Sequence, residues 1–311
     1  MQVTPIRLVD NAPLSGSAFH GDVMDSNNET IAMKGGAALN GFAITDSDAR
    51  HFIDLIYSHS GIVLTLDKKS LITSRLHKRL KLLGLQAFNE YLKYLQSSPD
   101  RDDEIIAMID EITTNKTSFF REKHHFDFLT SKALPELVTS EWSTLNAWSA
   151  GCSTGEEPYT LAMVLAEYFG APRNFHIVSS DLSTQALRTA RQAVYPNDLG
   201  APIPFPLRQK YTLTGHGSQH GRFRIVPELR DCVTFKQVNL IDHEWDVPGG
   251  MDIIFCRNVM IYFDKKTRGR IISMFMKKLK VGGYLFIGHS ETLGDIEHNL
   301  VQVRPTVYIR R

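Results

Sequence analysis

The sequence predicts an α/β protein in which a doubly wound, parallel sheet follows a small all-helical domain. Between residues 44 and 112, apolar residues recur at helical spacing and no strand pattern appears. After about Glu141, short apolar runs alternate with helical segments, which is typical of a parallel sheet covered on both faces. A length of 311 residues suits two domains better than one.

The composition excludes several classes of protein. Lys and Arg number 35 against 34 Asp and Glu, a net charge of +1, so we expect no nucleic-acid partner. No apolar run approaches the roughly 20 residues of a membrane span, so we expect no direct membrane insertion. The three cysteines are far apart and form no CxxC pair, which argues against a disulfide framework or a zinc site and favours the cytoplasm.

The changes in pattern set the expected domain boundaries. Residues 1–43 show no sustained period and are expected to form a poorly ordered leader, and residues 113–140 a linker that lines a cleft. The helical domain is expected over 44–112, with a first helix capped by Ser47 and further helices over 68–83, 87–95 and 102–112. The second of these helices carries a basic face, which is either a solvated surface or a docking surface for an acidic partner.

The sheet domain is expected over 141–311. Its predicted strands are 145–151, 175–181, 233–239, 251–256 and 284–288, and its predicted helices are 156–168, 184–192 and 265–280. Residues 194–231 interrupt this alternation with Pro196, Pro202, Pro204 and Pro206 and with an alternating run over 222–226, and predict a small inserted antiparallel β subdomain.

Ligands of such a sheet bind where its strands end. The loop that begins at Gly151 leads into a helix whose first turn carries Glu156 and Glu157, and these two acids would repel a phosphate. A cationic, phosphate-free nucleoside such as S-adenosylmethionine suits the loop, although the acids could equally complement the helix dipole. Asp181, after the second strand, is placed to bind ribose hydroxyls or to cap the next helix, a role for which Ser183 competes.

Two other patterns invite different chemistry. Residues 151–155 match the G-x-S-x-G nucleophile elbow, so Ser153 with His289 and an acid such as Asp252 could form a hydrolase triad. The helical region before the elbow and the lack of an HGGG segment disfavour that interpretation. The His124-His125 pair points in two directions on a helix, so we interpret both as solvated side chains and expect no metal site.

Four blocks of sequence, in order, resemble the CheR family of chemotaxis receptor methyltransferases. They are Thr-Asn-Lys-Thr-Ser-Phe-Phe-Arg-Glu (114–122), Ser-Thr-Gly-Glu-Glu-Pro-Tyr (153–159), Cys-Arg-Asn-Val-Met-Ile-Tyr-Phe (256–263) and Gly-His-Ser-Glu (288–291). The resemblance runs from about residue 44 to the C-terminus. It implies a methyltransferase that uses S-adenosyl-L-methionine, leaves S-adenosyl-L-homocysteine and methylates glutamate side chains in the cytoplasmic domain of a bacterial chemoreceptor.

The resemblance also implies site residues. Arg121 and Tyr262 are expected at the reacting end, where Arg121 would steer a carboxylate and Tyr262 would orient the acceptor. The insertion at 194–231, with Gly215-His216-Gly217, is similar to the element that binds the receptor's C-terminal peptide in some members. The expected cofactor-contacting residues are Asn115, Thr117, Arg121, Glu157, Asp181, Asn239, Leu240, Arg257 and Asn258.

Two further alternatives stay open at this point. A catalytically silent adaptor with a methyltransferase fold would show the same fold pattern, although the filled motif positions argue against lost activity. A nucleic-acid methyltransferase is disfavoured by the balanced charge and by Arg257–Tyr262 standing where an Asn/Asp-Pro-Pro-Tyr segment would be expected.

Overall fold

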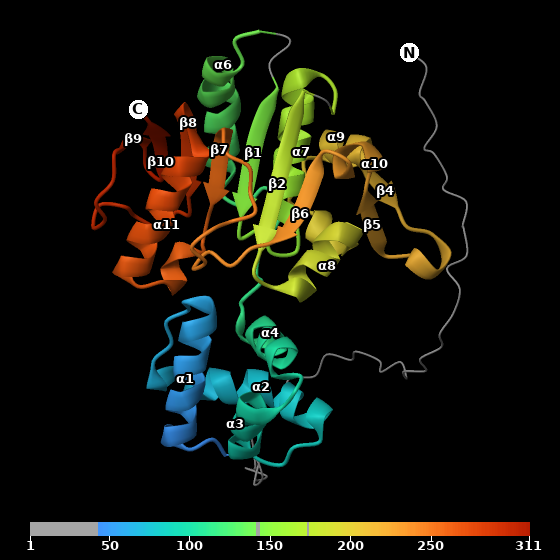
Figure 1. Ribbon diagram of the computed structural model, residues 1–311. Coiled ribbons are helices and arrows are strands. Elements are labelled where there is room, and N and C mark those ends of the chain that lie inside the picture. Colours follow the sequence, from blue (N-terminus) through green and yellow to red (C-terminus); the bar gives the residue numbers. More distant parts are fainter. Residues whose placement is uncertain (1–42, 141–143, 173) are drawn as a thin grey trace, which may run out of the picture. The chain divides into compact units, whose positions relative to one another are not determined.

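The computed structural model describes residues 43–140, 144–172 and 174–311, so the expected leader lies, but for Ala43, outside the described residues (Figure 1). The N-terminal part is all helical, as expected. Its helices are α1 (Asp46–Ser60), the 3-10 turn η1 (Leu66–Lys68), α2 (Lys69–Leu83), α3 (Phe88–Ser97) and α4 (Arg101–Ile112).

The start of α1 corrects one expectation from the sequence. Thr45, not Ser47, is the N-cap residue, and its hydroxyl accepts a hydrogen bond from Asp48 N. Both residues are hydroxyl-bearing, and the helix begins at the earlier of the two. Phe52 and Ile56 on α1 are fully buried in the core of the helical domain, with Ile72 and Leu76 of α2.

The basic side chains of α2 are largely engaged within the helical domain. Arg79 forms a 2.5 Å ion pair with Glu104 of α4, and Lys78 forms a 2.7 Å pair with Glu111. Arg75 donates to the main-chain oxygens of Ile112 and Thr113, each at 2.6 Å, at the C-terminal end of α4. Part of this basic face therefore stabilises the packing of α2 against α4.

The second part is a seven-stranded mixed sheet in the order β6-β2-β1-β7-β8-β10-β9. Five neighbouring strands are parallel and β10 and β9 are antiparallel, so the expected doubly wound sheet is confirmed with an antiparallel edge. The strands are β1 (Leu145–Ala150), β2 (Phe175–Asp181), β6 (Val233–Gln237), β7 (Met251–Cys256), β8 (Leu279–Ile287), β9 (Leu300–Arg304) and β10 (Val307–Arg310).

Helices cover both faces of this sheet. Consecutive residues of β7 point to opposite faces of the sheet. Phe255 packs in one apolar core with α7, and Ile254 packs in another with α11. The helices are α5 (Lys123–Phe128), the π-helical turn η2 (Leu129–Ala133), α6 (Leu134–Leu137), α7 (Glu156–Phe169), α8 (Thr184–Gln192) and α11 (Lys265–Lys278), with the 3-10 turn η5 (Met260–Tyr262) before α11. None of the described helices is long and apolar enough to cross a lipid bilayer.

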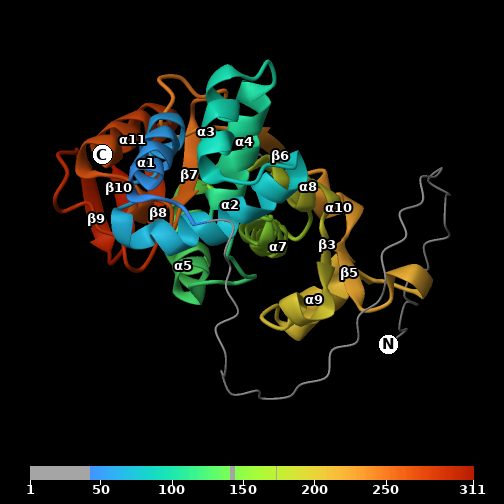
Figure 2. The ribbon, with the colours of Figure 1, turned by 90° about the horizontal axis from the view of Figure 1, so that it is seen from below.

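The expected insertion is a three-stranded antiparallel sheet in the order β3-β5-β4. Figures 1 and 2 show it on the side of the domain away from β9 and β10. Its elements are β3 (Val194–Pro196), η3 (Asn197–Gly200), α9 (Phe205–Tyr211), β4 (Thr212–Thr214), η4 (Gly217–Gln219), β5 (Arg222–Ile225) and α10 (Pro227–Arg230).

The strand order fixes where a ligand can bind. From β1 the chain continues to β2 and β6 on one side and then returns to β7 on the other side of β1. The switch point therefore lies between β1 and β7, and the carboxyl ends of these strands face the helices α1–α4 (Figure 1).

Candidate functional site

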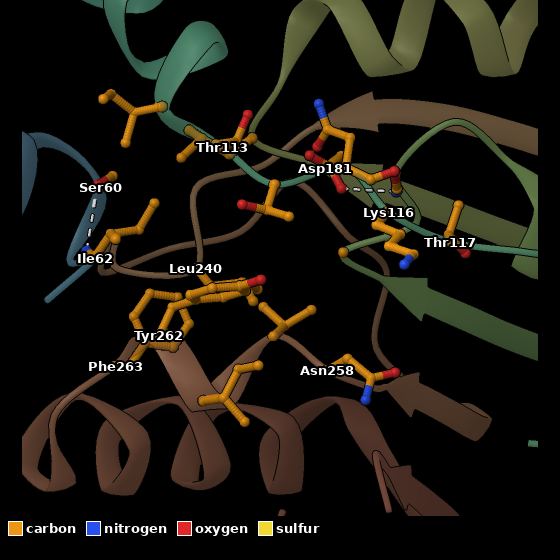
Figure 3. A pocket seen from close by; sticks show the side chains of 18 of the residues that line it. Ser60, Ile62, Thr113, Lys116, Thr117, Asp181, Leu240, Asn258, Tyr262 and Phe263 are labelled. Atoms are coloured by element: carbon orange, nitrogen blue, oxygen red, sulfur yellow. Dashed lines mark hydrogen bonds between the residues drawn. The ribbon is translucent and has the colours of Figure 1, made fainter. Parts of the chain in front are cut away.

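A cavity of about 560 Å³ lies at the switch point, a size suited to a nucleoside ligand. Its floor is made by the loops that follow β1, β2, β6 and β7, and its other walls come from residues near Ile62 and from the segment 112–117 (Figure 3). The helical domain thus supplies part of the wall. The cavity lies between the two domains, at the place where the expected cleft-lining segment begins.

All ten site residues expected from the sequence line this one cavity. They are Asn115, Thr117, Arg121, Glu157, Asp181, Asn239, Leu240, Arg257, Asn258 and Tyr262. Residues from five separate segments of the chain are therefore brought together, and the individual roles assigned to them remain predictions.

The loop after β1 comes close to its neighbours. Gly151 has φ of +79°, and a Cβ at this position would lie 2.4 Å from Cγ2 of Val259 in the loop after β7. The main-chain N–H groups of Gly151 and Cys152 both donate to Ser180 O, at 2.7 and 2.9 Å. A side chain at position 151 would push the loops after β1 and β7 apart and reshape the cavity wall.

Asp181 connects two of the loops that line the cavity. Its Oδ2 accepts a hydrogen bond from Ser153 N at 2.8 Å and its Oδ1 accepts one from Ser183 N at 2.9 Å. Ser183, and not Asp181, is the N-cap residue of α8, since its hydroxyl accepts from Ala186 N. Burial raises the pKa of Asp181 against the opposing effect of these N–H groups. Because a carboxylate has about four acceptor positions, capacity remains for ribose hydroxyls.

Glu157 and Glu156, which look alike in the sequence, have different surroundings. Glu157 accepts a hydrogen bond from Ser149 Oγ at 2.7 Å and one from Arg257 Nε at 2.8 Å. Glu156 accepts one from Thr154 Oγ1 at 2.6 Å and does not line the cavity, and burial raises its pKa. The partner Ser149 was not expected from the sequence, because it lies inside a strand and carries no motif.

Arg257 is held on its other side by the residues just before α5 and by the first turn of α5. Its Nη1 donates to Arg121 O at 2.8 Å and to His125 Nδ1 at 3.1 Å, and lies 3.5 Å from Glu122 Oε2. His125 is fully buried, so the expectation that both histidines are solvated was wrong for His125 and right for the exposed His124. The two rings do not point apart as expected, since their centroids lie 4.2 Å from each other, but only the His125 ring is buried in the core.

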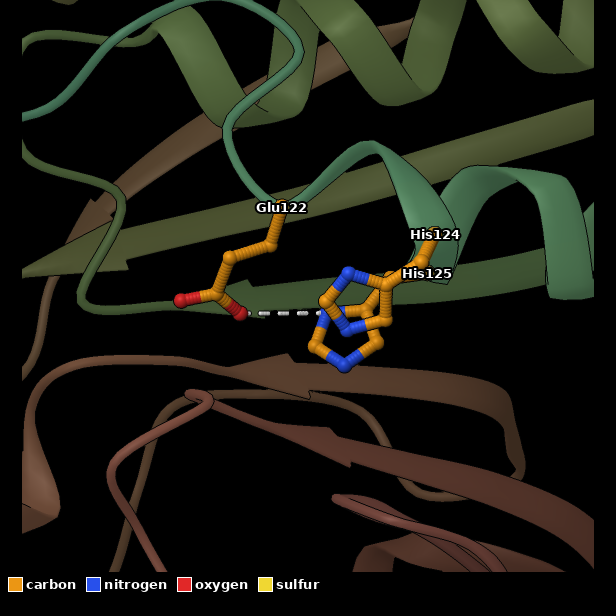
Figure 4. Close-up of side chains that lie close together, drawn as sticks. All are labelled: Glu122, His124 and His125. Carbon is orange, nitrogen blue, oxygen red and sulfur yellow. Dashed lines mark ion pairs between the residues drawn. The ribbon is translucent and has the colours of Figure 1, made fainter.

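Glu122, His124 and His125 place three potential metal-ligand atoms within 4.8 Å of one another (Figure 4). The Arg257 guanidinium already faces two of these side chains, at Glu122 Oε2 and His125 Nδ1. It supplies the positive charge that a cation would bring, and it would repel a second one. The cluster therefore acts as part of the arginine's support.

Arg121 and Tyr262, the two expected catalytic residues, are partly exposed at the cavity wall. Arg121 Nη1 donates to Lys116 O at 3.0 Å, which leaves other guanidinium donors for a ligand. Tyr262 O accepts a 2.8 Å hydrogen bond from Val63 N of the helical domain. The helical domain therefore holds the backbone of Tyr262, and its ring is drawn among the lining side chains in Figure 3.

The hydrolase alternative is not supported by these positions. Ser153 has a left-handed φ of 50°, as an elbow would, but its hydroxyl donates to Asn115 O at 2.9 Å. His289 Nδ1 lies 2.9 Å from Glu122 Oε1 instead. Asp252 lies at the start of β7, where it accepts from Asn146 N, and Ser153 follows the opposite end of the neighbouring parallel strand. No triad of these three residues forms.

Known proteins match the chain over both of its domains. CheR methyltransferase, all-alpha domain, matches residues 47–113, and CheR methyltransferase, SAM binding domain, matches residues 115–309. The chemotaxis protein methyltransferase of Borreliella burgdorferi is 43% identical over 272 residues, which cover 85% of this chain and 94% of that protein. Chemotaxis protein methyltransferase 2 of Pseudomonas aeruginosa is 41% identical over 268 residues, which cover 86% of this chain and 94% of that protein.

A solved structure, that of PKMT2 from Rickettsia typhi in complex with AdoHcy, aligns with 56% of this chain and 26% of its own. The TM-score is 0.34 and the sequence identity 14%, too distant a likeness to bear on function.

Proposed function

The chain belongs to the CheR family of S-adenosylmethionine-dependent chemotaxis methyltransferases, and from this membership we propose that it methylates glutamate side chains of a bacterial chemoreceptor. The observation that carries the proposal is the single cavity that gathers all ten expected site residues at the switch point of the sheet. A receptor's cytoplasmic domain would be the substrate, and the enzyme would then act in the cytoplasm.

The donor set of the cavity fits the cofactor. Asp181 retains acceptor positions at the end of β2, where ribose hydroxyls bind in doubly wound folds. Asn115, Thr117 and Asn258 add neutral polar groups, and the close approach of Gly151 to Val259 leaves the loop backbone near the ligand. Bound there, the cofactor supplies an electrophilic methyl group.

The residues of this chain would position the acceptor. A glutamate side chain has an ordinary pKa of about 4.3 and is ionised at neutral pH, so no general base is needed. Arg121 would steer its carboxylate, because a guanidinium neither gains nor loses a proton in this range. Tyr262 would donate a hydrogen bond that orients the attacking oxygen. The glutamate oxygen would accept the methyl group that the cofactor supplies, the cofactor's thioether would be the leaving group, and no side chain would need to take or give a proton.

Closing the cavity would favour the reaction. The carboxylate and the sulfonium carry opposite charges that cancel in the transition state, so a site that excludes water and fixes both groups lowers the barrier. The helical domain supports this role, since Val63 N holds Tyr262 O and Asn239 Nδ2 donates to His59 O at 2.7 Å.

Methyl transfer to a receptor fragment tests the proposal. We expect the full chain to incorporate labelled methyl groups from S-adenosylmethionine in a base-labile form, as glutamyl methyl esters require. Tyr262→Phe and Arg121→Ala should each lower the turnover number about 10- to 100-fold with the fold intact. Tyr168→Phe, on a partly exposed ring of α7, is the matched control and should match the parent.

Three results would count against this function. A chain that binds S-adenosylhomocysteine but never methylates a receptor would support the silent adaptor. Labelling that resists base would exclude a carboxyl ester. Equal turnover of Arg121→Ala and the parent, at saturating cofactor, would remove the role given to Arg121.

We further propose that the insertion binds the receptor's C-terminal peptide along β4. Gly215 N donates to Arg222 O and Val226 N donates to Tyr211 O, so the alternation of an antiparallel ladder turns the Thr214 N–H away from β5. In the order β3-β5-β4, this N–H is an edge donor, which an added strand could use.

Fluorescence anisotropy with the receptor's C-terminal peptide tests that edge. Thr214→Pro removes the outward N–H, and we expect it to weaken peptide binding at least tenfold. Thr214→Val keeps the N–H and should bind as the parent does. Equal binding by the proline variant would place the peptide elsewhere.

A further inference from the structure

The block Gly-His-Ser-Glu (288–291) follows β8, and its last residue, Glu291, is buried and only 9% exposed. No role has been assigned to Glu291 so far. A carboxylate at this depth must be compensated by hydrogen bonds or a counter-charge, because burying an ionised group without such partners is unfavourable.

Main-chain N–H groups of two different loops compensate Glu291. Its Oε2 accepts from Asn258 N at 3.0 Å and from Gly288 N at 2.5 Å, and its Oε1 accepts from Ile261 N at 3.3 Å. One side chain therefore connects the loop after β8 to the loop after β7. Burial raises the pKa of Glu291, and the N–H groups oppose that effect.

The loop that Glu291 holds lines the cofactor cavity. Asn258, Ile261 and Tyr262 all belong to the wall. Two of the three N–H groups that bind the carboxylate therefore come from residues that line the site, and Tyr262 follows the second of them directly.

The backbone of this loop also adopts a special conformation. Asn258 has φ of 61°, in the left-handed region that asparagine adopts more readily than most residues with a side chain. Gly288 packs directly against it, since a Cβ there would lie 2.6 Å from Asn258 Nδ2 and 2.7 Å from Asn258 N. Gly288 and the Glu291 carboxylate thus contact the Asn258 backbone directly and hold it in this conformation.

We propose that Glu291 is a positioning residue for methyl transfer, which fixes the backbone from Asn258 to Tyr262 and so aims both side chains into the cavity. The inference rests on the proposed function of the cavity, because it assigns Glu291 to the same reaction. Glu291 itself would touch neither cofactor nor acceptor.

The first measurement compares Glu291→Gln and Glu291→Ala with the parent in receptor methylation. Glutamine keeps one acceptor oxygen but turns an NH₂ group toward one of the N–H donors, whereas alanine removes every acceptor. We expect the turnover number to fall about 10-fold for glutamine and about 100-fold for alanine. The receptor KM should change less than twofold, because the acceptor's docking surface is not altered.

Glu297→Gln is the matched control, since Glu297 is exposed and lies six positions further along the chain. It should match the parent in every assay. Thermal unfolding of each variant separates positioning from a general loss of fold, and activities are compared at temperatures where all variants are at least 95% folded. A fall in activity that merely follows the folded fraction would overturn the proposal, as would a parental turnover number for Glu291→Ala.

Hydrogen exchange gives a readout that needs no receptor. The amides of residues 257–262 should exchange at least tenfold faster in Glu291→Ala than in the parent, while those of β1 and β2 stay protected. Unchanged protection of residues 257–262 would overturn the positioning role. If instead the parent methylates no receptor, the proposed function fails, and this exchange measurement still decides whether Glu291 holds the loop.

Discussion

Arg257 Nε donates a 2.8 Å hydrogen bond to Glu157 Oε2, and the two side chains are only 2% and 9% exposed. The pair joins the end of β7 to the first turn of α7 across the switch point. The guanidinium also lies over the rings of Phe126 and Phe255, each 5.4 Å from its centroid. A single buried arginine thus holds together the strand end, the helix start and the segment that leads to Arg121.

Replacing this arginine should cost stability as well as activity. Arg257→Met removes the cation and leaves the buried Glu157 without its counter-charge, and breaking a buried pair in this way typically costs about 3–5 kcal/mol. We expect urea unfolding to show a loss of that size, with weaker binding of S-adenosylhomocysteine by calorimetry.

Two companion variants sharpen the test. Adding Glu157→Gln to Arg257→Met removes the stranded charge and should recover part of the lost free energy of unfolding. Lys123→Ala breaks an exposed ion pair with Asp127 on α5 and should leave stability within experimental error. An Arg257→Met variant as stable as Lys123→Ala would show that the buried pair contributes nothing.

The sheet domain follows closely from the sequence where periodicity is strong. The predicted limits of α8 (Thr184–Gln192), β2 and β7 coincide with the observed ones. The strand β8 begins at Leu279, before the predicted Tyr284, because it pairs with β7 across an irregularity between Met251 and Ile253. The edge strands β9 and β10 were not predicted, since they are short and depend on long-range pairing, β10 with β8 and β9 with β10.

The strand pattern alone predicted the site residues at the strand ends, whereas Asn115, Thr117, Arg121 and Tyr262 were expected only from the family resemblance. Residues after parallel strands meet at one edge whatever the side-chain details, so the gathering of Asp181, Asn239 and Arg257 followed from topology. The hydrogen bonds among the site residues could not be predicted from the strand order. The contact of Arg257 with His125 joins residues 132 positions apart, and it depends on the fold of a segment that had no sequence pattern of its own.

Buried His125 predicts a pH-dependent stability. Arg257 has only donors, so His125 Nδ1 accepts and its Nε2 carries the proton toward Thr306 Oγ1, 2.8 Å away. Burial, reinforced by the charge of Arg257, lowers the pKa of His125 to about 3. The unfolded chain binds this proton near pH 6.5, so the stabilisation is complete above pH 6.5 and is lost as the pH falls toward 3.

The measurement is urea unfolding at pH 7 and pH 5. We expect the parent to lose about 2 kcal/mol more than His125→Gln over this interval, from the difference between the two pKa values. His51→Gln, at an exposed position of α1, should keep the parental pH dependence. Identical slopes for the parent and His125→Gln would mean that His125 is not the group that titrates.

The basic face of α2 predicts a salt-dependent association with the receptor. Its ion pairs within the helical domain limit the number of basic side chains that can take part. Lys81 is exposed, whereas Arg79 is committed to Glu104. Lys81→Glu should therefore weaken association at low salt without changing stability, because long-range attraction to an acidic receptor surface would be reduced. Arg79→Glu should lower the stability of the helical domain itself. Association of Lys81→Glu that equals the parent at every salt concentration would exclude docking through this residue.

Gly61 predicts a coupling between the helical domain and the cofactor cavity. It has φ of +70°, and a Cβ there would lie 2.3 Å from Cγ2 of Ile241, in the loop after β6. Its neighbours Ser60, Ile62 and Val63 line the cavity. Gly61→Ala should therefore displace this wall, and we expect the dissociation constant for S-adenosylhomocysteine to rise at least tenfold.

Gly61→Ala combines backbone strain with a steric clash, and Gly84→Ala is the control that adds the strain alone. Gly84 ends α2 with φ of +68° but has nothing within 4 Å of the added Cβ, so its replacement adds backbone strain of about 1–2 kcal/mol and no clash. We expect Gly84→Ala to lower the free energy of unfolding by that amount and to bind S-adenosylhomocysteine normally in calorimetry. Adding Ile241→Ala to Gly61→Ala removes the clashing methyl group and should recover part of the affinity. If Gly61→Ala binds as tightly as Gly84→Ala, the contact between the helical domain and the loop after β6 does not shape the cavity.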